Sequence, residues 1–250
     1  GPPTMTSLRV LALPAVLLLA RPLNAQSMPS EGNGMRLAQF GAAVAILGDQ
    51  VFVGEPIAAA AAGGKVHVYR RSANGWQSAA SLTVAGVGAG GQFGSALAAD
   101  GTTLLVGMRN TADSSRCGVK VFTRSAAGAW SAAGDLGGTP AARSGFGTSL
   151  ALAGDWAFVG APLTTTGGTV FVFRRSGSTW TDAGTLVGSS TTPGARFGTA
   201  VSIDGDRIAV AAPGRDGQKG MVYLFRRGAD GSWKEEAAVT GRRLAVNSQM

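Results

Sequence analysis

Residues 146–162 read FGTSLALAGDWAFVGAP, and this stretch decides the fold because its landmarks return three more times along the chain. The Phe-Gly pair recurs at steps of 53, 53 and 51 residues, beginning at Phe40, Phe93, Phe146 and Phe197. A turn glycine follows eight residues after each phenylalanine, at Gly48, Gly101, Gly154 and Gly205. Each unit also holds one tryptophan in phase, at Trp76, Trp130, Trp180 and Trp233. The sequence therefore predicts four tandem copies of one unit of about fifty residues.

Each unit has the pattern of four short β-strands. Leu150 and Leu152 alternate with small residues as in a first strand. A two-residue hairpin turn with positive φ follows, at Gly154-Asp155 here and at Gly48-Asp49, Asp100-Gly101 and Gly205-Asp206 in the other units. The apolar run 157–159 is typical of a strand that is covered on both faces. A four-stranded meander of this kind needs sheets packed on both sides. We therefore expect an all-β fold of β-propeller blades, four repeats of four-stranded antiparallel sheets.

The unit resembles the FG-GAP repeat, which builds the β-propeller at the head of integrin α subunits and occurs in bacterial secreted proteins. The resemblance rests on the Phe-Gly pairs, the Gly-Asp turns and Gly160-Ala161-Pro162, and it covers residues 40 to about 240. The other units depart from the last motif, with Gly54-Glu55-Pro56, Gly107-Met108-Arg109 and Ala211-Ala212-Pro213. Propellers of this family usually have seven blades, so four units imply an incomplete ring.

The domain boundaries follow from the repeat and from the N-terminus. Arg9, the apolar run 11–20 and the small residue Ala25 predict a secretory signal peptide over residues 1–25. A short linker (26–39) precedes the propeller (40–250), with repeats at 40–92, 93–145, 146–196 and 197–250. No second run of spanning length follows, so we expect no transmembrane segment in the mature chain. The expected location is secreted, or periplasmic if the source is a Gram-negative bacterium.

Metal binding and catalysis are not expected. Many members of the family carry a calcium loop rich in aspartates, but here the connection holds one Asp in most units, and Asp204 and Asp206 form the only place with two. The single histidine, His67, has no partner in sequence for a hydrolytic triad, and the single cysteine, Cys117, is expected to be a free thiol. We therefore predict no enzyme activity, no catalytic residue and no cofactor.

Charge recurs at one place in the repeat, the end of the third strand, and the chain carries a net charge of +8. The residues are Arg70, Arg71, Arg124, Arg174, Arg175, Arg226 and Arg227. A basic rim of this kind suits anionic glycans, lipid headgroups or nucleic acid. Arginines at strand ends also guard against edge pairing, and this second interpretation is favoured because no aromatic or polar specificity is phased with them. No nucleic-acid partner is expected.

The expected function is a secreted, non-catalytic binding or adhesion scaffold. Its unknown protein or glycan ligand would contact the loops that vary between units, at 57–64, 108–116, 163–168 and 214–219. A lectin-like carbohydrate binder and an accessory domain of a larger exported enzyme are the alternatives. Trp233 stands 17 residues before Met250, and the earlier tryptophans stand 16 or 17 residues before the next phenylalanine. A tight four-blade ring, a fragment and self-association remain open, and we hypothesise an open set of four blades.

Overall fold

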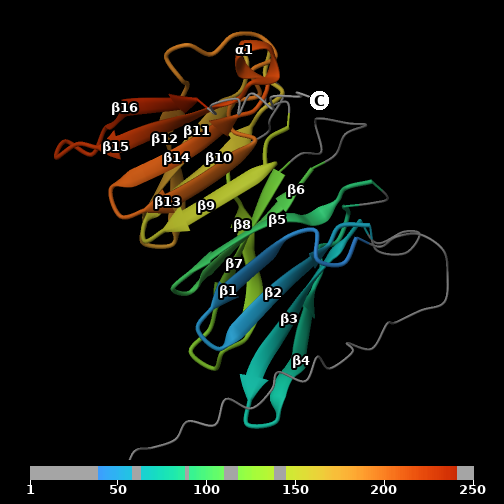
Figure 1. Cartoon of the computed structure of the whole chain (residues 1–250). Helices are drawn as coiled ribbons and strands as arrows, with labels where there is room; N and C mark the ends of the chain where they lie inside the picture. Colours follow the sequence, from blue (N-terminus) through green and yellow to red (C-terminus); the bar gives the residue numbers. More distant parts are fainter. Residues whose placement is uncertain (1–38, 58–62, 88–89, 110–117, 138–144, 241–250) are drawn as a thin grey trace, which may run out of the picture. The chain divides into compact units, whose positions relative to one another are not determined.

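A computed structural model describes residues 39–57, 63–87, 90–109, 118–137 and 145–240, all within one compact unit. These residues form four antiparallel four-stranded sheets, and the strands of each sheet follow in chain order (Figure 1). The first sheet holds β1 (Val44–Leu47), β2 (Gln50–Glu55), β3 (Lys65–Ser72) and β4 (Gly75–Leu82). The second holds β5 (Phe93–Asp100), β6 (Thr103–Met108), β7 (Gly118–Arg124) and β8 (Trp130–Asp135). The third holds β9 (Ser149–Ala153), β10 (Trp156–Ala161), β11 (Thr169–Ser176) and β12 (Thr179–Leu186). The fourth holds β13 (Ala200–Asp204), β14 (Arg207–Ala212), β15 (Met221–Arg227) and β16 (Trp233–Thr240), with a short helical turn, α1 (Arg215–Gln218), before β15. The all-β prediction with four-stranded blades is confirmed.

The hairpin turns between the first two strands use their glycines as the sequence predicts. Gly48, Gly101, Gly154 and Gly205 have φ values between +55° and +58°. In the second sheet the turn pair is Gly101-Thr102 and not Asp100-Gly101, because Asp100 still pairs with Thr103 at the end of β5. A register shift also falls at the same place between the third and fourth strands of every sheet, after Val68, Val121, Val172 and Leu224. The bulge bends each blade in the same way.

The apolar core consists of three clusters, one between each pair of consecutive sheets. Each sheet turns one face, here called the trailing face, toward the next sheet, and its leading face toward the previous one. Between the first and second sheets, Phe52, Val66, Val68 and Leu82 of the trailing face meet Phe93, Leu104, Val106 and Phe122 of the leading face. The equivalent residues of the second and third sheets, and of the third and fourth, form the other two clusters. Burial between sheets therefore stabilises the fold.

The Phe-Gly pairs lie where consecutive sheets approach most closely. The phenylalanines of the last three units are buried, and Phe93 and Phe197 form parallel bridges with Gly64 and Gly168 of the previous sheet. The amide of Phe93 donates a hydrogen bond to the carbonyl of Gly63 at 2.8 Å. In these last three units the second residue of the pair reaches a glycine of the previous sheet, and this contact requires that the glycine has no Cβ. The repeat motif thus joins blade to blade.

The outward faces of the first and fourth sheets are not covered by described residues. Phe40 is 47% exposed, whereas Phe93, Phe146 and Phe197 are at most 1% exposed. On the fourth sheet Val239 is 55% exposed, whereas its equivalents Leu82, Leu136 and Leu186 are buried. Packing between sheets joins β1 to β5, β5 to β9 and β9 to β13. In the described part of the chain, the four blades therefore do not close a ring.

The in-phase tryptophans open the fourth strands, as the repeat predicts, but they are half-buried. They pack against the preceding sheet: Trp130 makes an edge-to-face contact with Phe52, and Trp233 makes one with Phe158. Trp76 belongs to the first sheet, which has no preceding sheet among the described residues. The predicted signal peptide, residues 26–38 of the linker and Cys117 lie outside the described residues.

Candidate functional site

The seven arginines predicted from the repeat lie at one end of the sheets. In each sheet the third strand returns beside the turn that joins the first two strands, and a backbone hydrogen bond of 2.8 Å joins them there. These bonds run from the amides of Arg71, Arg124, Arg175 and Arg227 to the carbonyls of Asp49, Thr102, Asp155 and Asp206. The variable loops connect the second and third strands, and their described residues lie at the opposite end. The structure therefore separates the two candidate binding surfaces of the sequence.

The turn aspartates neutralise part of the basic rim. Arg70 pairs with Asp49 at 3.6 Å, and Arg175 pairs with Asp155 at 3.2 Å. Asp206 accepts a hydrogen bond from Arg226 at 2.9 Å, and this bond holds the pKa of the Asp206 carboxyl below its usual value. These aspartates bind arginines as well as forming the turns that the sequence predicts.

Asp204 and Asp206, the candidate metal ligands, differ in their surroundings. Asp204 ends β13, whereas Asp206 lies in the following turn, within 3.2 Å of the Arg207 guanidinium as well. The residues that the structure describes contain no group of three or more His, Cys, Asp or Glu side chains placed to hold a metal ion.

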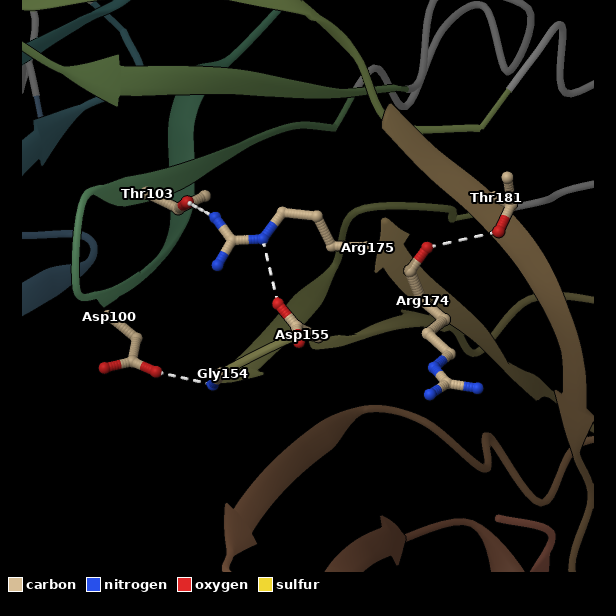
Figure 2. A network of polar contacts seen from close by, with 7 residues as sticks. All are labelled: Asp100, Thr103, Gly154, Asp155, Arg174, Arg175 and Thr181. Carbon is tan, nitrogen blue, oxygen red and sulfur yellow. Dashed lines mark hydrogen bonds and ion pairs between the residues drawn. The ribbon is translucent and has the colours of Figure 1, made fainter. Parts of the chain in front are cut away.

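Figure 2 shows how the rim joins the second and third sheets. Arg175 donates from Nη1 to the hydroxyl of Thr103 at 2.9 Å and from Nε to the carboxylate of Asp155 at 3.2 Å. Beside it, the amide of Gly154 donates to the carboxylate of Asp100 at 2.6 Å. Arg174, the neighbour of Arg175, extends its guanidinium away from this network. Here one arginine of the pair has a structural role and the other remains available.

The first residue of the second strand determines whether a sheet presents a hydrogen-bond acceptor to the next sheet. Gln50, Thr103, Trp156 and Arg207 occupy this position, since each pairs with the third strand at the same register. Gln50 is buried and accepts a hydrogen bond from the indole N–H of Trp130 at 3.0 Å. Thr103 accepts from Arg175. In the third sheet this position is Trp156, whose ring cannot accept a hydrogen bond as Gln50 does. The indole N–H of Trp233, which is equivalent to that of Trp130, is buried without a hydrogen-bond partner among the described residues.

Trp156 contacts two arginines, one from the third sheet and one from the fourth. The guanidinium carbon of Arg174 lies 5.4 Å from the Trp156 ring centre, and that of Arg227, from the fourth sheet, lies 5.6 Å from it. Trp233 meets the same ring edge to face at 5.8 Å. Within the described residues, neither guanidinium forms an ion pair, unlike Arg70, Arg175 and Arg226. Cation–π contacts hold both side chains while their N–H donors stay free for a ligand.

A shallow hollow of about 370 Å³ opens at this junction. Its lining joins the turn of the third sheet to that of the fourth and consists of Ala153, Gly154, Asp155, Trp156, Arg174, Gly205 and Arg227. Asp155 is the single carboxylate of this lining, and it is paired with Arg175. The hollow therefore has an excess of positive charge, and two guanidiniums in one concave site suit a carboxylate, sulfate or phosphate group.

A second hollow, of about 510 Å³, lies at the equivalent junction between the second and third sheets. Its lining is rich in hydroxyl groups, with Thr102, Thr103, Thr123, Ser178 and Thr179 beside Trp180 and Arg175. Arg175 is already bound to Thr103 and Asp155, and it also lies over the Trp180 ring at 5.6 Å. This hollow therefore has less free positive charge than the first.

The other candidates of the sequence have structural surroundings. Nε2 of His67 lies 2.6 Å from a carboxylate oxygen of Glu55, which also pairs with Lys65 at 3.4 Å. Of the variable loops, residues 163–168 and 214–219 are described throughout. The carbonyl of Gly167 accepts from the amide of Phe197, and the amide of Gly214 donates to the carbonyl of Ala195. These two loops hold neighbouring segments in place. No helix in the described residues is long and apolar enough to span a membrane.

Sequence reasoning located both arginines of the hollow but missed Trp156 and the contact between the sheets. Trp156 is the one tryptophan outside the phase of the repeat, and this departure was the available signal. Because Arg174 and Arg227 are 53 residues apart and belong to different repeats, their meeting on one ring depends on how the third and fourth sheets pack.

Comparison with known proteins supports the repeat. A family model described as FG-GAP repeat matches residues 180–225, which span the end of the third unit and the Phe197-Gly198 pair. The resemblance to the FG-GAP repeat is confirmed there. No curated protein matches the chain by sequence.

Two solved structures are similar to this chain. One is the Aleuria aurantia lectin in complex with α-methyl-L-fucoside, with a TM-score of 0.47, 15% identity and coverage of 76% of this chain. This chain spans 56% of the length of that lectin. The other is a protein of Bacteroides fragilis provisionally assigned as a 6-phosphogluconolactonase, with a TM-score of 0.45, 11% identity, and coverage of 80% of this chain and 71% of that one.

Proposed function

We propose that this chain is a secreted, non-catalytic binding module, and that it holds an anionic group of its ligand between Arg174 and Arg227. The observation that carries the proposal is the cation–π contact of two guanidiniums, both without an ion pair among the described residues, with Trp156 in the lining of one hollow. The ligand chemistry is a carboxylate, sulfate or phosphate group, such as acidic saccharides present at cell surfaces. Adhesion would follow if that ligand belongs to a surface.

The geometry supports this function because both arginines are held on one ring beside the hollow. The cation–π contacts position both arginines before the ligand arrives, so little side-chain entropy is lost on binding. Each charge-assisted hydrogen bond contributes roughly 1.5–3 kcal/mol, and about 1.4 kcal/mol corresponds to a tenfold change in affinity. Two arginines that share one oxyanion are thus sufficient for weak, salt-sensitive binding, and repeated ligand groups would raise the avidity.

The chain itself supplies the substitutions for a test. Trp156→Gln introduces the residue type that the first sheet has at the equivalent position, Gln50. Arg174→Thr introduces the residue type that the second sheet has at the equivalent position, Thr123. Arg70→Thr is the matched control, because Arg70 occupies the same strand position in the first sheet and pairs with Asp49. Because each substitute already occurs at the equivalent site of another sheet, we expect the variants to fold.

The experiment is a titration with glucuronate, inorganic sulfate and inorganic phosphate, followed by NMR of the indole N–H signals. Wild type is expected to shift the signals of Trp156 and Trp233 with at least one of these anions. Arg174→Thr should lower the affinity about tenfold, whereas Arg70→Thr should leave it unchanged. Equal weakening by both variants would indicate general attraction to the basic rim and would contradict the site. The preferred anion identifies the class of ligand group.

A lectin-like function is the second candidate, and the hydroxyl-rich hollow beside Trp180 favours it. Hydroxyl groups around an indole suit a neutral sugar, which binds through hydrogen bonds and ring contact. Binding of uncharged glycans on an array, lost in Trp180→Ala and kept in Trp156→Gln, would favour this candidate.

An accessory role beside an exported enzyme is the third proposal. The sequence of the mature N-terminus after export tests secretion, with cleavage expected after Ala25.

A further inference from the structure

The contact between consecutive sheets depends on one backbone position that has no side chain. A Cβ built on Gly54 would lie 2.0 Å from the carbonyl oxygen of Gly94 in the next sheet. The same construction gives 2.5 Å between Gly107 and Gly147, and 2.0 Å between Gly160 and Gly198. Gly54, Gly107 and Gly160 do not have a φ in the left-handed region, so the close approach of the next sheet is what requires glycine there.

The fourth sheet does not have glycine at this position. Ala211 pairs with Val222 as Gly54 pairs with Val66, Gly107 with Val119 and Gly160 with Val170, so the four residues are equivalent. The Cβ of Ala211 occupies the space that the Phe-Gly turn of a following sheet would need. Two residues earlier, Ala209 stands where Phe52, Leu105 and Phe158 stand in the other sheets. Phe52 and Phe158 pack against the tryptophan of the next sheet, and Ala209 has no side chain that could do so.

The leading face of the first sheet departs from the others at an equivalent place. Glu55 occupies the position of Met108, Ala161 and Ala212, which are buried against the previous sheet. Its carboxylate is bound to His67 and Lys65 within the first sheet. Covering this face with an apolar blade would remove the remaining water from a charged cluster, which is costly without a new partner.

We propose that these two outward faces are closed to a further blade, so that copies of this chain do not join head to tail. Ala211 and Ala209 close the trailing face of the fourth sheet by shape, and Glu55 closes the leading face of the first sheet by charge. A head-to-tail contact between two copies would bring both obstacles into the same interface. Terminal repeats of stacked proteins generally need such protection, because each internal interface is complementary to every other copy. The apolar residues Val44 and Ile46 can therefore stay exposed without polymerisation.

The test opens one face in each of two proteins and then mixes them. The first variant, Ala209→Phe with Ala211→Gly, restores the trailing face to the pattern of the third sheet. The second variant, Glu55→Ala, restores the leading face to that pattern. Each variant alone should sediment as wild type, because its other face remains closed. The mixture should form a complex of one chain of each, and no larger species, since the two remaining outward faces are closed.

The control adds Ile46→Asp to the Glu55→Ala variant, which places a charge on the leading face and should abolish the mixed complex. Circular dichroism verifies the folding of every variant. Should Ala209→Phe disturb folding, Ala211→Gly alone is mixed with Glu55→Ala and the same complex is expected with weaker affinity. The proposal is overturned if the mixture forms no complex. It is equally overturned if wild type self-associates and Ile46→Asp abolishes that association.

Discussion

The carbonyl oxygen of Gly94 lies 2.0 Å from the point that a Cβ on Gly54 would occupy, so the first two sheets meet backbone to backbone. The same relationship joins Gly160 and Gly198. Gly54→Ala and Gly160→Ala should therefore force neighbouring sheets apart, and we expect a loss of about 1–3 kcal/mol in the free energy of unfolding. Urea denaturation measures this loss. Ala211→Gly is the control and should cost no more than the backbone entropy term, roughly 0.5–1 kcal/mol. Equal costs for the three variants would contradict the close approach.

The phenylalanines of the Phe-Gly pairs should differ in importance according to their place in the stack. Phe93 is fully buried between two sheets, whereas Phe40 has no preceding sheet among the described residues and is 47% exposed. We expect Phe93→Ala to cost about 3–5 kcal/mol and Phe40→Ala about 1 kcal/mol or less. Chemical denaturation of both variants checks the difference. A similar loss for Phe40→Ala would mean that another segment covers the first sheet.

Among the described residues, Trp130 contributes an indole hydrogen bond that its equivalents do not. Its indole N–H donates to the buried side chain of Gln50, so Trp130→Phe leaves an amide oxygen without its partner. The expected cost is about 1–3 kcal/mol in the free energy of unfolding. Trp180→Phe is the matched control, since the Trp180 indole N–H has no hydrogen-bond partner in the part of the chain that the structure describes, and it should cost less. If Trp180→Phe destabilised the protein as much as Trp130→Phe does, the Gln50 contact would not be significant.

Acid should weaken the junction around Asp206. The hydrogen bond from Arg226 lowers the pKa of Asp206 below its unfolded value of 3.8. A group with a lowered pKa stabilises the fold above the unfolded pKa, and this contribution is lost as the pH falls through the folded pKa. Urea midpoints should therefore fall between pH 5 and pH 2, and Asp206→Asn should reduce part of that fall. An unchanged pH profile in Asp206→Asn would show that the pair has no effect on stability.

Calcium should not stabilise the protein. The hairpin turns of the first, third and fourth sheets carry Asp49, Asp155 and Asp206, and all three carboxylates are paired with arginines. A ligand that binds the folded state raises the melting temperature by mass action. Thermal unfolding with millimolar calcium and with a chelator should therefore give the same midpoint. A midpoint that rises with calcium would reveal a metal site outside these turns.

Much of the fold could be predicted from the sequence because the repeat is carried by local signals. The turn glycines have positive φ values in all four sheets, and the alternating residues of the first strands mark the face toward the previous sheet. The turn of the second sheet was displaced by one residue, since both Asp100-Gly101 and Gly101-Thr102 are acceptable turn pairs. The half-burial of the tryptophans and their contact with the preceding sheet could not be predicted, because the pattern within one unit does not say which neighbour a residue meets.

The candidate site depends on contacts between units, so only part of it could be predicted from the sequence. The arginines are phased by the repeat, but their contacts are not. Arg175 is bound by Thr103 of another sheet, whereas Arg174 lies over the ring of Trp156. Trp156 breaks the repeat, and its importance appears only when Arg227 of the next sheet is placed beside it. In the same way, Ala211 is a small change in sequence that matters because three equivalent glycines touch a backbone carbonyl.

The most direct measurement of the proposed binding site is a crystal structure of the protein soaked in selenate, whose selenium gives an anomalous signal. We expect a selenate between the guanidiniums of Arg174 and Arg227, beside the ring of Trp156, and no selenate there in crystals of Trp156→Gln. Anomalous density at the other arginines of the rim, with none at this hollow, would contradict the account.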